Sequence, residues 1–217
     1  MSEPSRLFPI AGDGWKFVLG FVVLGAVFFA FGPLISRFVG VLFILAALFS
    51  LYFFRDGKRV IPATSDVLSP GDGRVLEVSD VEGEGYGRGR VIRIFLSVLD
   101  GHVQRSPVAG KVVATQYRPG AFLDARNPRA PFVNECNSID IETPRGRVRV
   151  RQIAGLIARR ILCWVRPDDT VELGERIGLI RFGSQVDLYV PKEMDIVVKE
   201  GQRVRAGETV VARWTKA

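Results

Sequence analysis

The chain has 217 residues, and 30 Lys and Arg against 23 Asp and Glu give it a formal net charge of +7 at pH 7. Its two cysteines and single histidine, His102, exclude a disulfide framework and a zinc site that needs several histidines, and we expect no metal. The excess of basic residues favours an anionic partner such as nucleic acid or a phospholipid surface. The length allows one soluble domain and an additional segment.

The N-terminal segment, residues 1–60, is predicted to anchor the chain in a membrane. Residues 15–54 are rich in Phe, Val and Leu, and no charged residue falls between Lys16 and Arg37 or between Arg37 and Arg55. We expect a transmembrane helical hairpin with helices at about 15–32 and 36–54, joined by a Gly-Pro turn. Each helix roughly matches a hydrocarbon core of about 30 Å.

The charges around this hairpin predict its orientation. Basic residues precede the first helix and follow the second, whereas only Arg37 lies at the bend. The positive-inside rule therefore places both ends, and the domain that follows, on the cytoplasmic side of the cell membrane. Two alternatives are a signal peptide, which the second apolar span disfavours, and an interfacial hairpin that does not cross the bilayer.

Residues 61–217 are predicted to form a mainly β domain. Val, Ile, Gly and Arg dominate the composition, and short alternating runs are separated by Gly and Pro turn signals. Many short strands at this spacing indicate a compact sandwich or barrel. The runs lie at 74–79, 90–98, 110–116, 138–142, 147–153, 160–165, 176–181, 185–190, 194–198 and 209–214.

Two weak internal repeats refine this fold prediction. Residues 69–75 resemble 106–112, and residues 171–177 resemble 198–204. Paired elements with glycines in tight turns resemble the barrel-sandwich hybrid of biotinyl and lipoyl domains. The alternative is that Val-x-x-Gly recurs by chance in a β protein.

Two stretches of the predicted β domain are rich in arginine. Residues 117–137 lack periodicity and mix Arg with Pro, which predicts a mobile loop, and we place it at the substrate mouth. Arg147, Arg149 and Arg151 alternate with valines, so they share one face of a strand. That face is either solvated or in contact with anionic headgroups.

Gly183-Ser184 stands before a predicted strand and offers unusual chemistry. Glycine tolerates backbone angles that other residues avoid, and a following serine hydroxyl can attack the preceding carbonyl. The resulting ester can undergo β-elimination, which breaks the chain and leaves a dehydroalanine that hydrolyses to a pyruvoyl group. Gly-Ser before a strand is usually only a turn, so this hypothesis depends on the rest of the chain.

Three other segments carry polar groups that could join such a site. Asp72 lies between two glycines, which is a common turn pattern. His102 follows an apolar strand, and a lone histidine is more often structural than catalytic. Asn134 and Glu135 could offer polar groups to a pocket.

Taken in order, these segments resemble the phosphatidylserine decarboxylase proenzymes. The resemblance runs from about Pro62 to Trp214, and the short length together with the run after Phe182 looks like the compact prokaryotic subgroup. Its markers are Ser-Pro-Gly-Asp-Gly-Arg at 69–74, Phe-Leu-Ser and Asp-Gly-His within 95–102, Ser-Pro-Val-Ala-Gly at 106–110, Asn-Glu at 134–135 and Phe-Gly-Ser at 182–184.

The resemblance implies that the proenzyme cleaves itself between Gly183 and Ser184. Residues 1–183 would be the β chain, and residues 184–217 the α chain, which would begin with a covalent pyruvoyl group. Asp72 and Ser184 match two members of the Asp-His-Ser set that the family uses for maturation. His102 matches the histidine linked to decarboxylation. Arg105 stands where longer members have the histidine that acts as the maturation base, so that base is unassigned.

The resemblance also implies the reaction. The pyruvoyl carbonyl at residue 184 would form a Schiff base with the serine amine of phosphatidylserine. Carbon dioxide would be lost, His102 would reprotonate the product carbon, and phosphatidylethanolamine would be released without a diffusible cofactor. Asn134, Glu135 and Arg105 are the candidate substrate-binding residues.

The expected partners are a phospholipid substrate, a membrane, and the α and β chains of one precursor. The exact serine lipid and the oligomeric state stay open, with a homodimer as one option. The main alternative is a non-catalytic membrane-anchored adaptor or carrier with a biotinyl-like domain and Lys192 as its attachment residue. A nucleic-acid-binding barrel is disfavoured because it would need a row of exposed aromatics.

Overall fold

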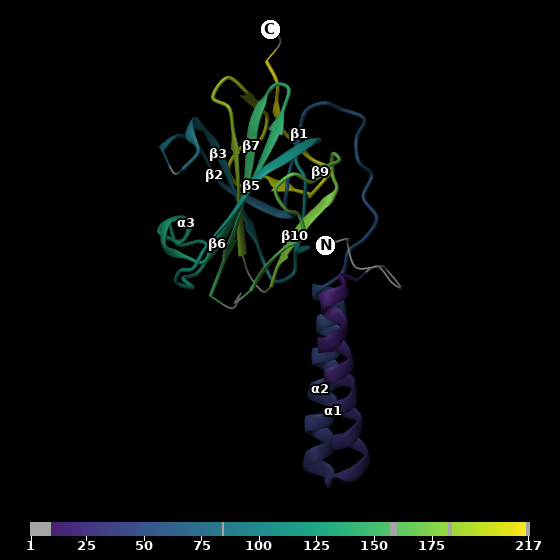
Figure 1. The fold of residues 1–217 in the computed structure, drawn as a ribbon. Helices are drawn as coiled ribbons and strands as arrows, with labels where there is room; N and C mark the ends of the chain where they lie inside the picture. The colour runs from purple at the N-terminus through teal and green to yellow at the C-terminus, as the bar shows by residue number, and fades with distance from the viewer. Residues whose placement is uncertain (1–9, 84, 157–159, 182–183, 216–217) are drawn as a thin grey trace. The chain divides into compact units, whose positions relative to one another are not determined.

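The computed structural model describes residues 10–83, 85–156, 160–181 and 184–215. It divides the chain into two compact units, a small one that ends at Lys58 and a larger one that begins at Arg59 (Figure 1). Gly183 lies outside the described residues, as do the flanking Phe182 and residues 157–159. Each unit is described by itself.

The small unit is a helical hairpin. A short 3-10 turn, Gly12–Gly14, leads into α1 (Trp15–Phe31), and α2 (Leu34–Phe53) follows after a two-residue break. Pro33 precedes α2 with extended backbone angles and ends the first helical path, as expected of proline. Both helices are long and apolar enough to cross a membrane, judged by length and composition, with mean hydropathies of 2.0 and 2.3. The predicted pair of helices is therefore confirmed.

The two helices approach each other closely where both carry glycine. A Cβ atom added to Gly40 would lie 2.9 Å from the carbonyl oxygen of Gly25, so neither position has room for a side chain. Stacking of Phe43 against Phe21 and Phe28 extends the contact along the hairpin. Small residues at the crossing and large apolar residues elsewhere are typical of helices that pack within lipid.

The larger unit is mainly β, as predicted. Its strands pair antiparallel in three sheets with the orders β13-β2-β3-β11-β7-β6-β5-β9, β1-β14-β12 and β4-β10-β8. Figure 1 shows the strands curling around one another, with the short helix α3 beside β6. The elements are β1 (Val67–Leu68), β2 (Gly73–Gly83), β3 (Gly87–Leu96), β4 (Val103–Arg105), β5 (Gly110–Arg118), α3 (Ala130–Val133), β6 (Cys136–Thr143), β7 (Gly146–Ala154), β8 (Ile161–Cys163), β9 (Thr170–Val171), β10 (Arg176–Ile180), β11 (Ser184–Val190), β12 (Asp195–Ile196), β13 (Arg203–Val204) and β14 (Val210–Arg213).

Both faces of the central strand β11 are buried. Val186, Leu188 and Val190 lie in the main apolar core, as their alternation predicted. The opposite face, with Asp187 and Tyr189, is also buried. The strand is therefore covered on both sides, and its polar face needs internal partners.

The prediction for the arginine face of β7 was wrong at two of three positions. Arg149 and Arg151 are buried rather than solvated or free to meet lipid headgroups. Arg149 pairs with Asp140 directly across the strands, Nε to Oδ1 at 2.6 Å, and Arg151 donates to the Tyr189 hydroxyl at 2.6 Å. Only Arg147 is exposed. The alternation of arginine with valine shows that the arginines share one face of the strand, but it does not show which residues cover that face.

The first sequence repeat corresponds to a repeated turn. The Ser69 hydroxyl donates to the Gly71 carbonyl at 2.7 Å, and the Ser106 hydroxyl donates to the Val108 carbonyl at 2.6 Å. The two Ser-Pro turns therefore adopt the same hydrogen-bonded form. This internal symmetry agrees with the predicted barrel-sandwich arrangement.

The second repeat has a different register from the one predicted. The amide of Gly174 donates to the Ser106 carbonyl and that of Gly207 donates to the Ser69 carbonyl, each at 2.9 Å. Gly174 thus corresponds to Gly207, whereas the sequence alignment matched it with Gly201. The prediction was displaced by six residues because it aligned a conspicuous Gly without knowledge of the strand that the glycine contacts.

Candidate active site

Ser184 is the first residue of the central strand β11. It pairs with Leu96 at the end of β3 and with Ala154 at the end of β7. Its side chain is fully buried, and its Oγ atom has no hydrogen-bond partner within the part of the chain that the structure describes. An unsatisfied buried hydroxyl costs about 1–3 kcal/mol, so its retention calls for a functional explanation.

His102 lies beside β10, the strand that precedes β11 in the chain. It is fully buried and immediately precedes β4, which pairs with β10. The amide of Ile180, the last residue of β10, donates to the His102 carbonyl at 3.3 Å. The sheet therefore holds the histidine close to the end of β10.

The turn before His102 fixes the tautomer of its ring. His102 Nδ1 lies 3.0 Å from the carbonyl oxygen of Asp100. Because a carbonyl only accepts, Nδ1 must carry the proton, and the neutral ring has its lone pair on Nε2. The Asp100 carboxylate accepts from the amide and hydroxyl of Ser97 at 2.9 and 2.7 Å, which holds this turn in place.

Asp72 packs against the residue that precedes His102. Its Oδ1 accepts from the Ala206 amide and its Oδ2 from Arg59 Nη2, both at 2.8 Å. A Cβ atom on Gly101 would meet Asp72 Oδ2, so a side chain at this position would displace the carboxylate oxygen that Arg59 contacts. The geometry suits a carboxylate that positions the His102 turn.

The turn that carries Asp72 also reaches the strands around Ser184. A Cβ atom on Gly71 would lie 3.4 Å from Leu96 and 3.7 Å from Val186. Leu96 is the register partner of Ser184. The structure therefore brings together the segments that carry the three residues proposed for maturation and catalysis.

The three candidate substrate-binding residues have structural contacts. Arg105 Nη1 donates to the carbonyl of Gly174 at 3.0 Å, in the turn between β9 and β10. Glu135 is buried, and desolvation raises the pKa of its carboxyl although the Ile161 amide donates to it. Neither contact tests a role in substrate binding, which stays a prediction.

Asn134 connects the loop before β6 to the strand beside Ser184. Its Oδ1 accepts from the Leu123 amide at 2.9 Å, and its Nδ2 donates to the carbonyls of Leu123 and Ala154 at 2.9 and 2.8 Å. Both amide protons are therefore engaged within the protein. Because Ala154 pairs with Ser184, this geometry favours a positioning role for Asn134.

A ladder of buried amides holds the backbone at His102, and the sequence prediction missed it. Asn137 Nδ2 donates to Gln152 Oε1 at 3.0 Å, Gln152 Nε2 to Gln104 Oε1 at 2.9 Å, and Gln104 Nε2 to the His102 carbonyl at 2.7 Å. One signal was present in the sequence, because Gln152 continues the face that Val148 and Val150 occupy. A polar residue on an apolar face needs a buried partner.

A pocket of about 340 Å³ opens beside the start of β11. Phe95, which pairs with Gln185, forms part of its wall. Residues 124–126 of the stretch 117–137 also line this pocket, whereas the predicted place of that stretch at the substrate mouth stays a prediction. A second pocket of about 210 Å³ has Arg145 and Trp214 in its lining. None of the candidate site residues is in the lining of either pocket. The lining of the first pocket is Phe95, Ser97, Val98, Asp124, Ala125, Arg126 and Leu156.

Within the described ranges, no group of three or more His, Cys, Asp or Glu residues could hold a metal ion. The larger unit is a β-rich domain with a buried serine at the start of β11 and a buried histidine just before β4. A family model described as phosphatidylserine decarboxylase matches residues 46–212. The phosphatidylserine decarboxylase proenzyme of Desulfotalea psychrophila (strain LSv54 / DSM 12343) is 40% identical over 214 residues, covering 94% of this chain and 96% of that protein.

The chain belongs to the phosphatidylserine decarboxylase family. The resemblance found in the sequence is thereby confirmed, and the chain is an enzyme of the decarboxylase type.

Proposed function

We propose that this protein decarboxylates phosphatidylserine to phosphatidylethanolamine after cleaving its own backbone between Gly183 and Ser184. The products would be a β chain of residues 1–183 and an α chain of residues 184–217. The observation that supports this most strongly is the buried, unsatisfied hydroxyl of Ser184 at the head of β11. Self-cleavage would convert that hydroxyl-bearing residue into a ketone.

The surroundings of Ser184 fit a pyruvoyl group. Its register partners Leu96 and Ala154 belong to the apolar core, and conversion would remove the hydroxyl that lacks a described partner. When present, a pyruvoyl carbonyl supplies an electron sink for the decarboxylation of an amino acid. The surrounding chain would supply binding, orientation and proton transfer.

His102 is the proposed proton carrier. Its Nε2 bears the lone pair of the neutral ring, so it can accept a proton from the Ser184 hydroxyl during maturation and donate one during turnover. Arg105 is a poor alternative base because a guanidinium stays protonated in proteins. Asp72 would act as a positioning residue, since Arg59 and Ala206 occupy its two oxygens.

The location proposed for the enzyme is the cytoplasmic side of the cell membrane. Residues 1–60 would anchor the chain through α1 and α2, each apolar along a length that could cross a bilayer. The larger unit, residues 61–217, would then act on a lipid that never leaves the same membrane. The excess of positive charge supports an anionic lipid substrate.

A comparison of wild type with Ser184→Ala tests the proposal. Wild-type protein should run as two chains on a denaturing gel and release carbon dioxide from phosphatidylserine in detergent micelles. Ser184→Ala should remain one chain and release none. A wild-type chain that stays whole and inactive would instead support the non-catalytic carrier.

A further inference from the structure

The pocket beside β11 carries one ion pair at its rim. Arg126 Nη2 lies 2.7 Å from Asp124 Oδ2, and Arg126 Nε lies 3.0 Å from Asp124 Oδ1. Both side chains are solvent-exposed, by 65% and 43%. We propose that this pair is the headgroup subsite, in which Arg126 binds the phosphodiester of the substrate. This inference rests on the proposed function and adds the residue that recognises the phosphate.

The location supports the assignment. Phe95 in the pocket wall pairs with Gln185, the residue after Ser184. Leu156, which also lines the pocket, is two residues beyond Ala154, the other register partner of Ser184. A headgroup held at the rim by Arg126 would therefore extend toward the start of β11. The volume of about 340 Å³ lies within the range of small-ligand sites.

Asp124 keeps the guanidinium in place while leaving donors free. Of the five N–H groups of a guanidinium, the fork to Asp124 uses two. Hydrogen bonds from Arg126 lower the pKa of the Asp124 carboxyl to about 2, so it is ionised at neutral pH. Arg126 also lies over the Phe95 ring, at 5.6 Å from its centroid. A pre-positioned guanidinium suits a phosphate because its planar fork matches two phosphate oxygens.

The pocket chemistry explains why Arg126 should bind the phosphate rather than the substrate carboxylate. The carboxylate loses its charge when it leaves as carbon dioxide, so a cation bound to it would stabilise the ground state and slow the reaction. The apolar side chains of Phe95, Val98 and Leu156 line the pocket and offer such a carboxylate no cation. The phosphodiester keeps its charge throughout, and its contact with Arg126 strengthens binding without opposing the chemical step.

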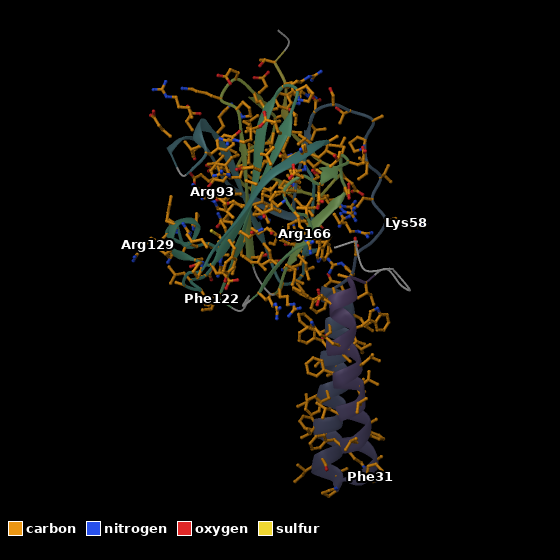
Figure 2. All side chains as sticks on the ribbon, viewed as in Figure 1. Phe31, Lys58, Arg93, Phe122, Arg129 and Arg166 are labelled. Carbon is orange, nitrogen blue, oxygen red and sulfur yellow. The ribbon has the colours of Figure 1, made fainter. Side chains whose placement is uncertain are left out.

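Because such a contact is equally strong before and during the reaction, its loss should change KM and leave kcat in place. The experiment measures both constants for Arg126→Gln with short-chain phosphatidylserine in neutral detergent micelles. Arg129→Gln is the matched control. Arg129 is an exposed arginine of the same loop that does not line the pocket, and Figure 2 shows it next to α3.

Arg126→Gln should raise KM about tenfold or more, the effect of losing one charge-assisted hydrogen bond, and change kcat by less than about twofold. The inhibition constant of glycerophosphoserine should rise by the same factor, while Arg129→Gln matches wild type. Cleavage into two chains confirms that each variant folds and matures.

Two results would overturn the subsite. The first is an unchanged KM in Arg126→Gln, whether or not kcat falls. The second is a defect seen only on anionic vesicles and absent in micelles, which would make Arg126 a contact for the bulk lipid surface. A wild-type chain that neither cleaves nor turns over would instead refute the proposed function, and this inference with it.

Discussion

Asp187 on β11 and Arg93 on β3 form a buried ion pair directly across the two strands. The Arg93 guanidinium carbon lies 5.6 Å from the centroid of the Phe132 ring in α3. Arg93 is labelled in Figure 2. If the chain is cleaved before Ser184, Asp187 belongs to the α chain and Arg93 to the β chain. The pair would then hold the new N-terminal strand in register.

Substitution of Asp187 should therefore destabilise the fold strongly. Asp187→Ala leaves the Arg93 charge buried and incompletely compensated, and we expect a loss of about 3–5 kcal/mol in the free energy of unfolding. Denaturant titration in detergent measures this loss. Glu82→Gln is the control, because its pair with Arg88 is exposed and should contribute no more than about 1 kcal/mol. Equal effects of the two substitutions would show that the buried pair does not hold the strand.

His102→Gln should lower decarboxylation by about 100-fold or more, the typical contribution of a positioned acid or base. The amide keeps a donor near the Asp100 carbonyl but cannot deliver a proton from the position of Nε2. Turnover should be measured on protein that has been separated from any uncleaved chain. Slower cleavage in the same variant would assign the maturation base to His102 as well. Normal turnover in the cleaved fraction would remove His102 from the mechanism.

Glu135 should make stability depend on pH with a defined sign. Its carboxyl has a raised pKa in the folded state because of desolvation, against an ordinary value of 4.5. Below pH 4.5 the carboxyl is protonated in both the folded and the unfolded state, so it does not change the free energy of unfolding. As the pH rises through the folded pKa, the unfolded state is increasingly favoured, and stability is lost. Glu135→Gln cannot ionise and should gain stability relative to wild type as the pH rises from about 4.5.

Thermal denaturation of both proteins between acid and neutral pH tests this sign. A constant difference in melting temperature across the range would contradict the desolvated carboxyl.

Gly201 and Asp168 occupy corresponding turns with left-handed backbones, at φ +80 and +78. Gly201→Ala should cost roughly 1–2 kcal/mol, because an alanine Cβ strains this conformation while meeting no atom within 4 Å. Gly201→Asp should cost less, since aspartate tolerates the same angles and already does so at Asp168. Unfolding free energies measure both. An equal loss in the two variants would remove backbone strain as the cause.

Elements with a local repeat of apolar residues were predicted from the sequence, whereas elements that depend on residues far away in the sequence were not. The α1 and α2 helices and strands such as β11 were evident because their apolar residues repeat along a local period. The four unpredicted strands, β1, β4, β9 and β13, have only two or three residues each and depend on distant partners. A segment that short carries no period of its own, and the equally short β8 and β12 were predicted only because each lies within a longer alternating run, 160–165 and 194–198.

The candidate site shows the same division. Ser184, His102 and Asp72 were proposed from motifs, and the structure places the segments that carry them near one another, while their roles stay predictions. Arg59 and Gln104 were missed because each acts through a residue on another segment, Asp72 and Gln152 respectively. Such pairs depend on tertiary packing, and local sequence carries little information about it.

The intact mass of the purified protein tests the central claim most directly. We predict two polypeptides, one of residues 1–183 and one of residues 184–217 whose N-terminus carries a ketone in place of an amine and resists sequential degradation. A fully active preparation in which every molecule is a single chain of 217 residues, with the Ser184 hydroxyl intact, would contradict the proposed mechanism.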